Sequence, residues 1–298
     1  MDHDPRVCDY EGSSYRTDFW EGQGRDYEDR AERIALRCLL PPTGRRLLDI
    51  GAGFGRLSEF YSGYDQVVLL DYSRSLLRQA QSRLGRDGRI LYVAANFYSM
   101  PFVDSAFDTA MMVRVIHHVE EVPDLLDEVA RVLVGGGTYV LEFASKRHLK
   151  AILRYALRRQ GWSPFDPTPY EFAEMNYDFH PVWMRDRLIE AGFHVKHQRT
   201  VSHFRLPLLK RWVPARILAT LDGVCQPTGA WWQLTPSVFV QGIVDKSVGA
   251  GPADSLFCCP ACGCAGLHES SQVLSCANCG RRWPIEDGIY NLKAALPV

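Results

Sequence analysis

The chain has 298 residues, of which 46% are hydrophobic and 23% are charged, and its formal net charge is −1. This length is enough for a core domain of ~200 residues and a smaller module. The near-neutral charge excludes a general attraction to nucleic acid or to an anionic membrane, so any such contact must come from a local patch. No apolar run reaches the ~18 residues of a spanning helix, and the first residues lack the basic-then-apolar order of a signal peptide. We therefore expect a cytoplasmic protein with no transmembrane segment.

A helix is predicted near the N-terminus, after a polar and acidic segment at residues 1–22. In residues 26–40, apolar and small side chains recur at helical spacing until Pro41 and Pro42 end the pattern. We expect this helix to pack against the sheet whose first strand follows it.

An apolar strand runs into a glycine-rich turn at residues 47–57, with the sequence LLDIGAGFGRL. The glycines remove Cβ atoms where the backbone must turn and approach a ligand, and they permit backbone angles that other residues resist. Asp71 closes the next apolar run about 20 residues later, where a carboxylate can bind both hydroxyls of a ribose. A nucleotide-type site is indicated, although glycine loops also form plain turns.

Strands and helices then alternate. Residues 90–95, 107–113 and 138–143 predict further strands, and residues 73–84 and 123–133 predict helices between them. Such alternation produces a parallel sheet covered by helices on both faces, with ligands bound at the carboxyl ends of the strands.

The stretch from about residue 45 to residue 143 resembles the class I S-adenosylmethionine-dependent methyltransferases. Residues 49–55 are similar to the first motif of that family, an acidic residue followed by x-Gly-x-Gly-x-Gly, and residues 71–73 to its ribose motif. Residues 95–102 are similar to its adenine loop, although Asn96 stands where an acidic residue is commoner. The resemblance implies an α/β fold with a doubly wound, Rossmann-like, seven-stranded sheet. It also implies S-adenosyl-L-methionine as cofactor.

The resemblance further implies roles for particular residues. Asp49 would order the loop and hold the methionine amino group, and Asp71 would bind the ribose. The implied cofactor-binding set is Asp49, Gly51, Ala52, Gly53, Asp71, Tyr72, Asn96, Phe97 and Arg114. Many family members fold an aromatic N-terminal segment over the cofactor, so residues 1–22 are either such a lid or a surface tail.

His117 is the candidate catalytic residue, because it follows the fourth strand, where an acceptor would bind. A general base is needed only if the acceptor carries a proton at neutral pH. The pair His117-His118 is also a common scaffold feature of the family, and that reading stays open.

Residues 146–182 predict an insertion that caps the substrate pocket. Basic and apolar residues interleave in 146–159 without an acidic residue, which describes either a solvated helix face or a surface for phosphate or an anionic membrane. The segment 162–170 is rich in proline and aromatic residues and is expected to remain irregular.

Two more strands are predicted, at residues 193–204 and 236–244, with a short helix at 182–191 before them and one helical stretch at about 208–221 between them. The resemblance implies that these strands form an antiparallel edge. Residues 1–246 would then make the methyltransferase domain.

The C-terminal part concentrates six of the nine cysteines between residues 258 and 279. After a small-residue linker at 247–255, two Cys-x-x-Cys pairs follow, formed by Cys259, Cys262, Cys276 and Cys279. Two such pairs suit the tetrahedral site that Zn²⁺ prefers, and a redox pair is the alternative. Residues 256–298 also resemble the small zinc-ribbon proteins that bind and activate RNA and protein methyltransferases.

The acceptor is only partly constrained. No Asn-Pro-Pro-Tyr run, found in enzymes that methylate base amino groups, follows the fourth strand, so a small-molecule or lipid-like acceptor is favoured. An RNA or protein acceptor, with the ribbon presenting substrate or stabilising the enzyme, is the first alternative. A non-catalytic cofactor-binding interaction subunit is the second.

Overall fold

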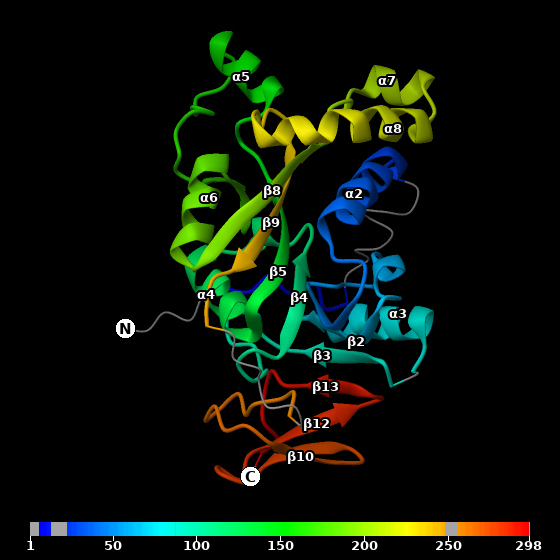
Figure 1. Ribbon diagram of the computed structural model, residues 1–298, viewed down its shortest axis with the longest axis vertical. Coiled ribbons are helices and arrows are strands. Elements are labelled where there is room, and N and C mark those ends of the chain that lie inside the picture. Colours follow the sequence, from blue (N-terminus) through cyan, green and yellow to red (C-terminus); the bar gives the residue numbers. More distant parts are fainter. Residues whose placement is uncertain (1–5, 13–22, 87, 248–254, 298) are drawn as a thin grey trace.

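The structure, a computed structural model, describes residues 6–12, 23–86, 88–247 and 255–297 (Figure 1). Most of the predicted arm at 1–22 and most of the predicted linker at 247–255 lie outside the described residues. Within the described ranges, no helix is long and apolar enough to cross a membrane.

The predicted Rossmann-like fold is confirmed, and the seven predicted strands belong to a sheet of 11 strands. The seven are β1 (Gly44–Ile50), β2 (Tyr64–Asp71), β3 (Ile90–Ala94), β4 (Phe107–Met112), β5 (Leu133–Ala144), β8 (Phe193–Val201) and β9 (Ser237–Val244). They lie in the order β3-β2-β1-β4-β5-β9-β8, and β9 runs antiparallel to both of its neighbours. The order reverses between β1 and β4, so the carboxyl end of β1 stands at the switch point, where this architecture binds ligands.

Helices cover both faces of the sheet. On one face lie α2 (Asp26–Leu39), α3 (Arg74–Leu84) and α8 (Ala215–Cys225), and on the other lie α4 (Val122–Val132) and α6 (Pro181–Glu190). Adjacent strand residues alternate between the two apolar clusters, so that Leu47 belongs to one and Leu48 to the other. Burial on both faces explains why these strands are continuous apolar runs.

The C-terminal strands extend this sheet. They are β10 (Leu267–Ser270), β11 (Val273–Cys276), β12 (Arg282–Glu286) and β13 (Ile289–Asn291). β13 lies beside β3 (Figure 1) and pairs with it in parallel, which completes the sheet. Pairing with β13 satisfies backbone groups of β3 that would otherwise form an open edge.

The C-terminal region also shares its core with the rest of the molecule. Trp283 and Cys276 belong to the same apolar cluster as strands β1, β4 and β5, and Phe257 stacks on Phe102 with ring centroids 5.9 Å apart. The Gln81 side chain of α3 donates to the Asp287 carbonyl at 2.9 Å. These contacts make the C-terminal strands part of one packed body.

Two helical predictions differ in detail. The stretch expected as one helix at about 208–221 is two, α7 (Pro207–Trp212) and α8, because Pro214 adopts an extended conformation before α8 and has no backbone N–H to continue a helix. In the basic segment 146–159, the helix α5 spans only Leu149–Ala156, and Lys146 is buried with its ammonium donating to the Thr168 carbonyl.

We predict that Ile289→Ala destabilises the whole chain by about 2–5 kcal/mol. Ile289 lies in β13 beside Tyr92 of β3, is 1% exposed and packs in the cluster under α2 and α3. Denaturant unfolding followed by tryptophan fluorescence measures the effect, with exposed His268→Ala on β10 as control. An unchanged main transition, with the C-terminal strands melting separately, would contradict this shared core.

Candidate functional site

The glycine turn joins the carboxyl ends of β1 and β2. Gly51 and Gly53 both have positive φ, at 70° and 54°, and a Cβ atom at Gly51 would overlap the Val115 side chain. The amides of Gly51 and Ala52 both donate to the Leu70 carbonyl, at 2.7 and 3.1 Å. Glycine is therefore required at position 51 by both backbone conformation and space.

Asp71 connects this turn to the start of α3. One carboxylate oxygen accepts from the Gly53 amide at 2.8 Å, and the other accepts from the Ser73 amide at 2.8 Å. Burial raises the pKa of Asp71 to about 6. Tyr72 follows it, and Lys293 from the C-terminal region places its ammonium 4.3 Å from the centroid of the Tyr72 ring.

Asn96 and Phe97 lie just after β3, whose last residue pairs with Asp71 at the end of β2. The Ala95 amide donates to the Asp71 carbonyl at 3.3 Å, which ties the two strand ends together. The Asn96 side-chain oxygen accepts from the Tyr98 amide at 3.0 Å, and the buried Phe97 ring packs on the Tyr98 ring with centroids 4.8 Å apart.

Asp49 is buried beneath the turn and accepts a hydrogen bond from the Tyr61 hydroxyl at 2.5 Å. Burial raises its pKa to about 7. The roles predicted for Asp49 in ordering the loop and in holding a methionine amino group both stay predictions.

A cluster of charged side chains lies next to the glycine turn. Glu32 of α2 is 0% exposed and forms ion pairs with Arg56 at 2.8 Å and with Arg114. Arg114 has a φ of 62°, and its amide donates to Glu142 at 2.9 Å. The Ser237 hydroxyl donates to the second oxygen of Glu142 at 2.7 Å. The cluster holds the ends of β1, β4 and β5 in one arrangement.

A cavity of about 400 Å³ opens next to Arg114. Residues of distant elements line it, among them Arg25, Arg114, His117, Glu142, Asp178 and Arg205. Burial raises the pKa of Asp178 to about 6. The volume falls in the range of small-molecule sites, and most of the lining side chains are polar or charged.

The two histidines differ in their contacts. His118 Nδ1 lies 2.9 Å from the Met175 carbonyl, which can only accept, so this nitrogen carries the proton and Nε2 accepts from the Tyr10 hydroxyl at 2.9 Å. His117 lines the cavity, and burial together with the neighbouring His118 and Arg114 lowers its pKa well below 6.5. His117 is therefore a neutral imidazole at pH 7.

Several cavity residues were not predicted from the sequence. Phe172 and Asp178 come from the short hairpin of β6 (Tyr170–Ala173) and β7 (Asn176–Asp178), and Arg205 and Ser237 flank the antiparallel strands. None of them stands in a local motif, so only the position of this hairpin in the predicted cap pointed toward the cavity.

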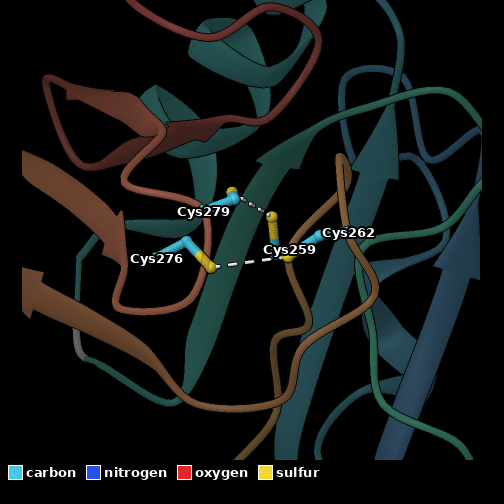
Figure 2. Close-up of side chains that lie close together, drawn as sticks. All are labelled: Cys259, Cys262, Cys276 and Cys279. Carbon is cyan, nitrogen blue, oxygen red and sulfur yellow. Dashed lines mark hydrogen bonds between the residues drawn. The ribbon is translucent and has the colours of Figure 1, made fainter.

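The four predicted cysteine ligands meet at one point (Figure 2). The sulfur atoms of Cys259, Cys262, Cys276 and Cys279 all lie within 4.8 Å of one another, with Cys259 to Cys279 and Cys262 to Cys276 each at 3.6 Å. A tetrahedral Zn²⁺ site with bonds of about 2.3 Å separates its sulfurs by about 3.8 Å, so the residues fit this metal. The adjacent Cys258 instead directs its thiol to the Phe102 carbonyl at 3.2 Å.

Comparisons with known proteins find similarity to methyltransferases over part of the chain. Residues 48–141 match the family model described as a methyltransferase domain. A 24-methylenesterol C-methyltransferase 2 of Oryza sativa subsp. japonica is 38% identical over 114 residues, which cover 37% of this chain and 31% of that protein. A ubiquinone/menaquinone biosynthesis C-methyltransferase UbiE of Pseudomonas savastanoi pv. phaseolicola is 29% identical over 179 residues, covering 54% of this chain and 70% of that protein. This chain thus spans about a third of the rice protein and 70% of the bacterial one.

Solved structures agree on the fold. A chain of the complex between the Haloferax volcanii Trm112 methyltransferase activator and a methyltransferase has a TM-score of 0.56 at 16% identity, covering 78% of this chain and 97% of that chain. An S-adenosylmethionine-dependent methyltransferase from Mesorhizobium loti has a TM-score of 0.52 at 22% identity, covering 72% of this chain and 97% of that chain. The chain thus has the Rossmann-like fold of these structures, and its residues 48–141 are similar to a methyltransferase domain.

We predict that Glu32→Gln lowers the free energy of unfolding by about 3–5 kcal/mol, because two largely buried guanidinium groups lose their shared anion. The matched control is Glu190→Gln, whose side chain is 58% exposed and pairs with Arg187, where a loss of at most about 1 kcal/mol is expected. Denaturant unfolding measures both. Equally small losses would show that the buried cluster does not hold the strand ends together.

Proposed function

We propose that the protein transfers a methyl group from S-adenosylmethionine to a small-molecule or lipid-like acceptor. The observation that carries this proposal is that the glycine turn, Asp71 and Arg114 all stand at the carboxyl ends of neighbouring parallel strands, while Arg114 also lines the cavity. Arg114 belongs to both parts, because it follows β4 next to the turn and also lines the cavity. A cofactor in the turn would therefore face an acceptor in the cavity.

Each part of the cofactor has a proposed partner. The Asp71 carboxylate binds the ribose hydroxyls, Tyr72 lies beside it, and Phe97 and Asn96 flank the adenine. Gly51, Ala52 and Gly53 admit the cofactor to the backbone, and Asp49 and Arg114 act toward its methionine part. Bound S-adenosylmethionine supplies a methyl group on a good leaving group, so the chain has to align the acceptor and exclude water.

His117 is the proposed general base. Its neutral imidazole lines the cavity and can accept a proton from an acceptor hydroxyl or acidic C–H group. His118 has a positioning role, since both of its ring nitrogens are engaged by Tyr10 and Met175.

Two observations favour a small or lipid-like acceptor. The cavity of about 400 Å³ has the size of a small-molecule site. The relatives with matching sequence are named for a sterol and for ubiquinone and menaquinone. An RNA or protein acceptor remains the alternative, with the C-terminal strands as the presenting module.

Asp71→Ala should weaken binding of S-adenosylhomocysteine roughly ten- to a hundredfold, because a charged acceptor of two hydroxyl hydrogen bonds contributes about 1.5–3 kcal/mol. Calorimetry measures the affinity, with Asp65→Ala at the exposed start of the same strand as control.

The affinity of the wild type should be constant above pH 7 and fall as the pH drops through about 6, because protonation of Asp71 removes the hydrogen-bond acceptor. Equal affinity of the Asp71 and Asp65 variants would refute the assignment.

The acceptor class is tested by methyl transfer from radiolabelled S-adenosylmethionine. Quinol and sterol acceptors are compared with total RNA and with a protein extract, and His117→Ala is measured beside His118→Ala. We expect label in a small acceptor and a loss of kcat in the His117 variant without loss of cofactor affinity. Label only in RNA or protein would select the alternative.

We also propose that residues 256–298 form a zinc ribbon. The ribbon is a separate stretch of the sequence, but its strands continue the sheet of the methyltransferase domain. Cys259, Cys262, Cys276 and Cys279 would be the ligands, in agreement with the geometry of Figure 2. Metal binding would stabilise strands β10 to β13 and, through β13, the edge strand β3.

One equivalent of zinc should accompany the purified protein, and Cys276→Ser should remove most of it and lower the Tm of the whole chain. Cys38→Ser, at an exposed cysteine on α2, is the matched control and should change neither value. Metal analysis and thermal unfolding give the two readouts. Zinc retained in the Cys276 variant, or absent from wild type purified without chelator, would refute the ribbon.

A further inference from the structure

Helix α5 exposes a stripe of leucine. Leu149, Leu153 and Leu157 recur at intervals of four residues and are 56%, 53% and 63% exposed, and Ala151 is the buried residue of the helix. Lys150, Arg154 and Arg158 follow at the same interval and are also exposed. Large apolar side chains that share one helix face are normally buried, so this stripe is typical of a surface that has a partner.

The segment of α7 and α8 repeats this combination. Leu208 and Trp212 are 69% and 73% exposed, and Ile217 on α8 is 44% exposed. Arg211 and Arg216 are exposed beside them, and the Arg211 guanidinium lies 5.6 Å from the centroid of the Trp212 ring. A tryptophan next to a cation suits a boundary between water and lipid.

The charge of the two segments is strongly one-sided. Residues 146–165 and 203–225 contain ten lysines and arginines and one acidic residue, the buried Asp222, although the whole chain has 34 basic and 35 acidic residues. Arg205 and Lys210 contact Glu28 of α2, which leaves the exposed cations of α5, α7 and α8 as the basic surface. Such a surface complements an anionic one.

Both segments stand at the end of the molecule opposite the C-terminal strands (Figure 1). The cavity lies between them, because His148, the residue before α5, and Arg205, just before α7, both line it. The Leu149 amide also donates to the Leu234 carbonyl after α8, at 2.8 Å. A flat partner that covers this end would therefore lie against the mouth of the cavity.

We propose that α5, α7 and α8 form a docking surface for an anionic lipid bilayer, with the leucines and Trp212 entering the interface and the flanking cations contacting phosphate headgroups. The delivery of a lipid-like acceptor from the bilayer to the cavity rests on the proposed function, whereas the docking itself does not. RNA would satisfy the cations, but it offers no apolar layer for the leucine stripe, and a bilayer satisfies both.

The test is cosedimentation of the full chain with vesicles of phosphatidylcholine alone or mixed with phosphatidylglycerol. We expect at least about tenfold stronger partition onto the anionic vesicles, weakened by salt. R154E/R158E should reduce it about twentyfold or more, since each basic residue near an anionic surface contributes about fivefold. L153S/L157S, which keeps the charge, should reduce it about tenfold or more.

The matched control is R78E/R83E, which makes the same charge change on exposed positions of α3 and should retain partition. Partition that is indifferent to phosphatidylglycerol would overturn the bilayer assignment, and so would equal losses in R154E/R158E and R78E/R83E. Binding of the chain to total RNA in a parallel assay, together with no effect of L153S/L157S on vesicle partition, would also overturn it. Circular dichroism shows that each variant is folded. Cofactor affinity and transfer to a soluble acceptor are measured without vesicles, so their failure would refute the methyltransferase proposal and leave vesicle partition standing.

Discussion

The Asp71 carboxylate is the contact on which the site depends. It accepts one hydrogen bond from the glycine turn after β1 and one from the cap of α3 after β2, at 2.8 Å each. These two bonds fix the turn, the strand end and the helix start relative to one another. Burial raises the pKa of this carboxylate to about 6, because it destabilises the ionised form, and further hydrogen-bond donors would stabilise that form.

The same strand ends are supported from two sides. Glu32 forms ion pairs with Arg56, which follows the turn, and with Arg114. On the opposite side of Asp71, β13 pairs with β3. Arg74, next to the cap of α3, forms an ion pair with Glu286, and Lys293 reaches the Tyr72 ring. The cysteine cluster is thus linked through β12 and β13 to the proposed ribose site, and a metal there would act on the same part of the molecule.

The parts that the sequence predicted are those that depend on local pattern. Strand runs, the glycine turn and Asp71 follow from spacing alone, and the cysteine pairs follow from theirs. Asp178, Arg205 and Ser237 could not be predicted, because three distant elements bring them to one cavity. The pairing of β13 with β3 was also missed, since a strand of three residues, Ile289–Asn291, is too short to show periodicity. Pro214 is the sequence signal that could have divided α7 from α8.

The central claim is that the turn after β1, Asp71 and the cavity form one cofactor and acceptor site. A crystal structure of the protein soaked with S-adenosylhomocysteine tests it most directly. The account predicts the ribose hydroxyls on Asp71, the adenine beside Phe97 and the amino-acid end directed to Arg114 and the cavity. A nucleoside bound elsewhere, or a homocysteine sulfur pointing away from the cavity and His117, would contradict it.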